Sequence, residues 1–288
     1  MPRNNYNHKH SLHDEVEEPL TSSSSSTSSS STSDSITILG FGSLLSKTSA
    51  QMTFPNLQNF RLGKIQNYKR VFAHPASIFF QRDIINYDTK EMSSLSAEYC
   101  VGASFIWSVF EVCNNNGELM ERQRSTNSHD NDGSLEDYHH VPSMAFRERE
   151  EEFDIIMVPY EEIISNSSST LSSSSSSSSS TKVGILCCRS TDEKYIKLWG
   201  QKRFDENYKK YNIDTIWNWG KDSGLRPCGP YLRHCVLAAK KMGPVCFDSF
   251  LDETFLVDRK TTIRSYLRQY PHVMDTLPPP ELQQRYGG

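Results

Sequence analysis

The chain has 288 residues, with 31 lysine or arginine and 35 aspartate or glutamate residues, giving a formal net charge of −4 at pH 7. This slightly acidic balance, without a basic block that contains aromatic residues, argues against nucleic acid as a partner. No apolar run approaches the length that a bilayer requires, and the N-terminus lacks the pattern of a secretory signal. We therefore expect a soluble protein that binds neither nucleic acid nor a membrane.

The cysteines indicate the redox environment. They number seven, an odd count, and none of them form a C-x-x-C pair. This pattern argues against a disulfide framework and against a structural zinc site. We expect no metal site and a reducing compartment, the cytoplasm.

Three polar segments are predicted to contribute nothing to a core. Residues 1–35 form a Ser-rich tail, residues 114–140 a polar insert, and residues 165–181 a serine run between two apolar stretches. Such compositions cannot bury enough apolar surface to offset the entropy of ordering. The remaining length suits one sizeable core. The sequence thus predicts a disordered tail over 1–35 and a single domain over 36–288, with disordered inserts at 114–140 and 165–181.

The first half of the domain is predicted to contain mainly strands. Residues 35–39 form a β-branched run that leads into a glycine turn at 40–43 and a helix over 44–50. Residues 63–73 and 99–112 are further strands. The second of these strands is apolar on both faces, which is typical of a central strand.

After the polar insert, residues 141–143 are predicted to open a helix that runs through Glu152, with Ser143 as its N-cap. Residues 153–160 and 182–188 are expected to pair as a hairpin whose tip holds the serine run, because closure entropy grows slowly with loop length. From Thr191 onward the pattern becomes helical, with segments near 195–199, 217–219, 231–239, 249–255 and 261–270. Strands followed by helices predict an α+β fold, with a small mixed β-sheet or barrel and a helical C-terminal half.

The glycine turn is the first candidate for a binding site. Phe41-Gly42-Ser43-Leu44 lies between a strand and a helix start, where exposed backbone N–H groups can hold an anion or an oxyanion. A third glycine, a distal acidic residue and a phosphate-loop lysine are absent, so the turn is not a nucleotide fingerprint. Taken alone, a structural tight turn is the more common explanation.

The second candidate is the charged run at residues 147–152. A solvated helix end is the usual explanation of such a run. Phe146 and Glu150, however, lie one helical turn apart on one face, so Glu150 points inward if Phe146 enters the core. A carboxylate partly withdrawn from water has a raised pKa, as a proton shuttle near neutral pH requires.

Together these segments resemble the γ-glutamylcyclotransferase fold family, and especially its ChaC-like glutathione-specific branch. Phe41–Leu44 lies where the family has Tyr-Gly-Ser-Leu, and Arg149–Asp154 resembles its Arg-Glu-containing helix end. Tyr68–Phe72 and Val101–Ala103 are similar to its aromatic-Arg-Phe and Val-Gly-small strands. The similarity covers about residues 36–190, and the helical half is less similar, which suggests an uncharacterised subgroup.

The resemblance implies a barrel of the γ-glutamylcyclotransferase type and assigns residue roles. Glu150 would be the catalytic acid/base, with Glu148, in a second Arg-Glu pair, as the fallback. The substrate-binding residues would be Phe41, Gly42, Ser43, Leu44 and Tyr231. Phe41 replaces the family's tyrosine, and Tyr231 follows a Gly/Pro turn that resembles one of the family.

The activity implied is conversion of a γ-glutamyl amine or peptide, glutathione being one candidate, to 5-oxoproline and a free amine. The partner would be a small-molecule γ-glutamyl substrate, and the reaction needs neither a cofactor nor a metal. A non-catalytic binding module on the same fold is the alternative. A further hypothesis treats the Ser-rich tracts as phosphorylated tethers for partners.

Overall fold

The computed structural model describes residues 35–114, 117–124, 138–163 and 182–288. Ser33–Gly288 form one compact unit. The predicted tail 1–35, apart from Ser35, and the predicted insert 165–181 lie outside the described residues.

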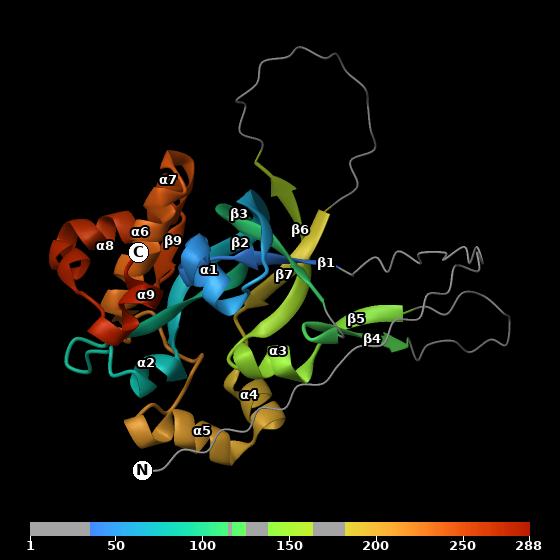
Figure 1. The fold of residues 1–288 in the computed structure, drawn as a ribbon. Coiled ribbons are helices and arrows are strands. Elements are labelled where there is room, and N and C mark those ends of the chain that lie inside the picture. The colour runs from blue at the N-terminus through green and yellow to red at the C-terminus, as the bar shows by residue number, and fades with distance from the viewer. Residues whose placement is uncertain (1–34, 115–116, 125–137, 164–181) are drawn as a thin grey trace, which may run out of the picture. The chain divides into compact units, whose positions relative to one another are not determined.

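Five strands close into a barrel (Figure 1). In ring order they are β3 (Glu91–Cys113), β1 (Ser35–Gly40), β7 (Lys182–Cys188), β6 (Asp154–Glu162) and β2 (Gln58–Pro75), and β2 pairs back with β3. The β1–β7 pair is parallel, and the other four pairs of the ring are antiparallel. The predicted α+β class with a small mixed sheet or barrel is therefore confirmed.

Strand β3 pairs with β1, β2, β7 and β8 (Arg226–Pro227), and it is buried on both faces over residues 107–110, whereas Tyr99 and Val101 are exposed. Phe105, Trp107 and Val109 alternate into the barrel interior, where they pack with residues from the other strands. Phe110 is buried in a separate cluster outside the barrel. The sequence prediction of a central strand holds, and β3 extends beyond the predicted 99–112 in both directions.

Helices cover the barrel in two groups. Figure 1 shows α6 (Gly229–Lys241), α7 (Pro244–Asp252), α8 (Ile263–Gln269) and α9 (Gln283–Tyr286) gathered on one side. The other group is α4 (Asp192–Trp199) with α5 (Gln201–Asn207). Two short strands, β8 (Arg226–Pro227) and β9 (Thr254–Leu256), add to β3 and β2 in parallel. The helical C-terminal half is confirmed, and no helix among the described residues is long and apolar enough to cross a bilayer.

The prediction of a helix near residues 217–219 is wrong. Residues 216–217 form a bend in an irregular connection. The Asp192 carboxylate accepts hydrogen bonds from the backbone N–H groups of Ile216 and Trp217 at 3.0 and 2.9 Å. A side chain of α4 thus satisfies the backbone that a helix would otherwise satisfy.

The expectation of disorder over 114–140 is wrong at both ends of the segment. Strands β4 (Met120–Arg124) and β5 (Tyr138–Pro142) form an antiparallel pair. Leu119 and Met120 are buried, and the Asn114 side chain bonds the backbone of both residues. Two buried apolar side chains and one asparagine therefore fix this pair, while residues 115–116 and 125–137 lie outside the described part.

Three predicted helices have different bounds. The segment near 249–255 is helical only to Asp252, the end of α7, and Thr254–Leu256 form β9. The first helix, α1 (Lys47–Thr53), starts late because Gly42–Leu45 form a 3-10 turn, η1. Helix α3 (Met144–Arg149) has the predicted N-cap, since the Ser143 hydroxyl accepts the N–H of Phe146 at 3.1 Å. It ends at Arg149 instead of Glu152, and Glu150 becomes its C-cap.

Arg70 joins the barrel to the helical layer. The side chain is completely buried on β2, and its guanidinium lies between the rings of Phe105 and Phe250 at 4.7 and 5.0 Å. It donates to the Ile106 carbonyl at 2.9 Å and to the Ser249 hydroxyl of α7 at 3.2 Å. Burial lowers the pKa of Arg70 to about 10. The aromatic-Arg-Phe motif thus has a structural role here.

We expect Arg70→Ala to reduce the free energy of unfolding by about 3 kcal/mol, because it empties a buried site and leaves polar groups without partners. Urea unfolding at neutral pH measures the loss. Arg264→Ala is the matched control, since Arg264 pairs with Asp248 and Asp252 at the surface and should cost less than about 1 kcal/mol. Equal losses in the two variants would contradict a specific role for Arg70.

Candidate active site

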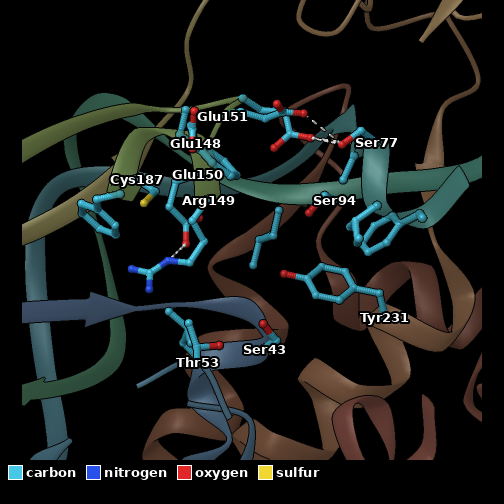
Figure 2. Close-up of a pocket in the computed structure, with 18 of the residues that line it drawn as sticks. Ser43, Thr53, Ser77, Ser94, Glu148, Arg149, Glu150, Glu151, Cys187 and Tyr231 are labelled. Atoms are coloured by element: carbon cyan, nitrogen blue, oxygen red, sulfur yellow. Dashed lines mark hydrogen bonds and ion pairs between the residues drawn. The ribbon is translucent and has the colours of Figure 1, made fainter. Parts of the chain in front are cut away.

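A cavity of about 1000 Å³ opens beside the barrel. Its walls come from η1, the C-terminal end of α3, α2 (Ser77–Gln81), the α4–α5 pair, α6 and α9. Figure 2 shows the end of α3 facing Ser43, with Tyr231 entering from α6. We call this space the main cavity.

Glu150 enters the main cavity from the end of α3. Its N–H bonds the Phe146 carbonyl at 3.1 Å, and its own carbonyl accepts the N–H of Phe153 at 2.9 Å. Phe146 is buried, which meets the condition under which Glu150 was expected to point inward. The Glu150 side chain is 23% exposed and lines the cavity (Figure 2).

The surroundings of Glu150 shift its ionisation toward neutral pH. Burial raises the pKa of Glu150 to about 7, from an ordinary value near 4.5. Arg149, with its Nε 3.6 Å from a Glu150 carboxylate oxygen, opposes this rise, and so does Arg285. A carboxyl with this pKa can both accept and return a proton near neutral pH.

Cys187 is a cavity residue that the sequence placed on a strand, next to Cys188, but that was not among the predicted site residues. Its side chain on β7 lines the main cavity together with Glu150, and each of the two groups shifts the pKa of the other. Burial, reinforced by the Glu150 charge, raises the pKa of the Cys187 thiol well above its ordinary value, so the thiol stays protonated near neutral pH. Strand alternation was the available signal, because Cys188 belongs to the barrel core and Cys187 must face outward.

The other glutamates of the charged run have different environments. Glu151 pairs with Arg203 of α5 at 2.7 Å. Glu152 is buried and accepts hydrogen bonds from the Ser77 hydroxyl at 3.1 Å and the Tyr208 hydroxyl at 2.7 Å. Glu148, the fallback residue, lines the cavity and is exposed. The charged run at residues 147–152 is therefore not a uniformly solvated helix end.

The glycine turn is shaped by Tyr231. Gly42 has φ +68°, and a Cβ added to it would lie 2.2 Å from the Tyr231 hydroxyl oxygen. Burial raises the pKa of the Tyr231 hydroxyl well above its ordinary value, and the Ser94 hydroxyl and the Ser43 backbone N–H oppose this rise. Position 42 therefore requires glycine both for its left-handed backbone and for the close approach of Tyr231.

The structure brings together most of the predicted substrate-binding residues. Phe41, Ser43, Leu44 and Tyr231 line the main cavity with Glu150. Gly42 is buried beneath the Tyr231 hydroxyl, so it shapes the turn from below. The Ser43 N–H, expected to hold an oxyanion, is close enough to the Tyr231 hydroxyl to lower the pKa of that hydroxyl, whereas Figure 2 shows the Ser43 hydroxyl directed toward the cavity. The described residues contain no group of three or more metal-ligating side chains.

No family model and no curated protein matches the chain. Among solved structures, it is similar to a crystal structure of an uncharacterized protein from Homo sapiens, with 11% identity and a TM-score of 0.38 over 73% of this chain and 80% of that one. It is also similar to a structure titled gamma-glutamyl cyclotransferase, with 11% identity and a TM-score of 0.32 over 65% of this chain and 91% of that one.

We expect Glu150→Gln to be more stable than the unaltered protein near pH 8 and equally stable near pH 4. The folded pKa of about 7 lies above the ordinary value of 4.5, so the folded state retains the proton more tightly. The stability of the unaltered protein should therefore fall as pH rises from 4.5 through 7, by on the order of 2 to 3 kcal/mol relative to the variant.

Urea unfolding across this pH range measures the difference between the two proteins. Glu148→Gln is the matched control, and its stability should run parallel to that of the unaltered protein because Glu148 is exposed. Parallel curves for Glu150→Gln as well would show that Glu150 is not withdrawn from water.

Proposed function

We propose that the chain is a γ-glutamylcyclotransferase-like enzyme that converts a small-molecule γ-glutamyl amine or peptide to 5-oxoproline and a free amine. The observation that carries this proposal is Glu150, whose carboxyl lines a cavity with a pKa of about 7 across from the Phe41–Leu44 turn. The resemblance of both segments to the family supports the same reaction. Glutathione is the first substrate to test.

In the proposed reaction the substrate attacks itself. The Glu150 carboxylate takes a proton from the α-ammonium, and the freed amine forms a bond with the γ-carbonyl carbon. The bond from that carbon to the leaving nitrogen then breaks as Glu150 returns its proton to this nitrogen. The attacking nitrogen loses its second proton to the released amine, which leaves as an ammonium. No water is consumed and no group is oxidised. Because both reacting groups belong to one molecule, holding the substrate folded lowers much of the entropic barrier.

The glycine turn would hold the substrate opposite Glu150. We propose that the Ser43 hydroxyl donates to the substrate, because it is directed toward the cavity (Figure 2) while the Ser43 backbone N–H lies near the Tyr231 hydroxyl. Phe41 and Leu44 supply apolar surface on the same wall. Tyr231 then acts as a positioning residue for the turn, in addition to lining the cavity.

The compartment that we propose is the cytoplasm. Each of the seven cysteines carries a free thiol, and four of them are buried. Reducing compartments keep thiols in this state.

We expect Glu150→Gln to lower the rate of 5-oxoproline formation by about 10³-fold, because a carboxamide can neither accept nor return the proton. Glu148→Gln is the matched comparison and should stay within about threefold of the unaltered protein. The assay incubates each protein with glutathione and other γ-glutamyl compounds and quantifies 5-oxoproline. Loss of activity in Glu148→Gln alone would move the catalytic role to Glu148. Binding without any product would favour the non-catalytic module.

The pH dependence gives a separate test. We expect kcat/KM to rise with pH through an apparent pKa of about 7, because Glu150 must be ionised to accept the proton. Arg149 lowers the pKa of Glu150, so Arg149→Gln should move this limb to higher pH. Arg264→Gln, a surface change of the same charge, should leave it in place. If the pH dependence of kcat/KM stays unchanged in Arg149→Gln, the group that titrates is not Glu150.

A further inference from the structure

The segment of residues 283–288 forms part of the cavity wall and is held by several contacts. The Ser49 hydroxyl of α1 donates to the Arg285 carbonyl at 2.8 Å. The Tyr286 ring is buried against Tyr231, and its hydroxyl accepts from Arg82 Nη1 at 2.8 Å. The N–H of Gly288 donates to His234 of α6 at 3.1 Å. These contacts fix the backbone that carries Arg285 beside the main cavity.

Arg285 has unused hydrogen-bond donors at this position. Its side chain lines the main cavity, and its Nε is buried without a partner among the described residues. Its guanidinium also contacts the Tyr286 ring at 5.9 Å. The buried Nε does not itself face the cavity, but no hydrogen bond or ion pair joins the terminal nitrogens of the same guanidinium to any described residue. These donors can therefore meet an acceptor supplied from outside the chain.

The other arginines that line the cavity already have partners. Arg82 bonds the Tyr286 hydroxyl, Arg149 pairs with Glu150, and Arg203 pairs with Glu151. Arg285 is therefore the cavity arginine whose guanidinium is available to a ligand. Its charge reaches Glu150, since it lowers the pKa of that carboxyl.

We infer that Arg285 binds the α-carboxylate of the γ-glutamyl substrate, an assignment that rests on the proposed function. In a γ-glutamyl group the α-ammonium and the α-carboxylate are attached to the same carbon. Glu150 and Arg285 present the opposite charges to these two groups from one cavity. The planar guanidinium matches a carboxylate through two parallel hydrogen bonds, which fixes the orientation of the group.

This assignment predicts the substrate class. The protein should select γ-glutamyl compounds with a free α-carboxylate over those with an α-carboxamide, because the neutral amide loses the ion pair. The leaving amine lies on the other side of the scissile bond and does not enter into this preference.

The test measures binding without turnover, in protein that carries Glu150→Gln. The two probes are γ-glutamylmethylamide and its counterpart with an α-carboxamide, and titration calorimetry gives Kd for each. We expect the carboxylate to bind at least about tenfold more tightly, and Arg285→Gln to reduce this ratio to about one. Lys240→Gln, on the exposed end of α6, makes the same charge change outside the cavity and should keep the ratio. An unchanged ratio in Arg285→Gln overturns the assignment.

A second measurement avoids substitution at position 285. Phenylglyoxal modifies accessible arginines, and mass spectrometry locates the modified residues. We expect γ-glutamylmethylamide to protect Arg285 and the carboxamide counterpart to leave it reactive. Equal protection by both compounds, or by neither, overturns the assignment even if Arg285→Gln fails to fold.

The assay for 5-oxoproline in the unaltered protein keeps the two proposals apart. A carboxylate preference that depends on Arg285 in a protein that forms no 5-oxoproline would retain the binding residue and reject the cyclisation. Product formation with a preference independent of Arg285 would retain the enzyme and reject the binding residue. If neither probe binds at millimolar concentration, the Arg285 assignment fails, and the 5-oxoproline assay alone decides the proposed function.

Discussion

The contact between the Tyr231 hydroxyl and the backbone at Gly42 sets the geometry of the whole site. It joins the turn after the first barrel strand to α6, and it exists because position 42 has no side chain and a left-handed backbone. On the same helix, His234 bonds Ser49 of α1 and the backbone of Gly288. One face of α6 therefore places the glycine turn, the first helix and the segment that carries Arg285.

Placement of charge at the end of α3 depends on where the helix stops. Because α3 ends at Arg149, the next three glutamates turn in different directions and each meets a different environment. Glu151 reaches a guanidinium and Glu152 reaches hydroxyl groups, whereas Glu150 remains at the cavity with a raised pKa. If α3 continued through Glu152, its side chains would point around the helix axis, and fewer of the three glutamates would line the main cavity.

Features that follow from local patterns could be predicted from the sequence. The strand 182–188, the Ser143 cap and the inward direction of Glu150 came from alternation, capping and helical spacing. Features that depend on distant partners could not be predicted in this way. The strand that begins at Met120 depends on the Asn114 side chain and on its pairing with β5, and the bend at Trp217 depends on Asp192. Arg285 lies in a short polar stretch with no local signal, and only its contacts place it at the cavity.

In the hairpin of β6 and β7, the connection between the strands and the Glu150 site lie at opposite ends. Its register runs from Tyr160 opposite Lys182 at one end to Asp154 opposite Cys188 at the other. Glu150 and Cys187 belong to the second end, whereas the connection between the strands leaves from the first. Residues can therefore be added to this connection, or a reporter domain grafted into it, without altering the distances around the carboxyl group, since closure entropy changes slowly with length. We therefore expect a longer β6–β7 connection to leave the Asp154–Cys188 end of the hairpin unchanged.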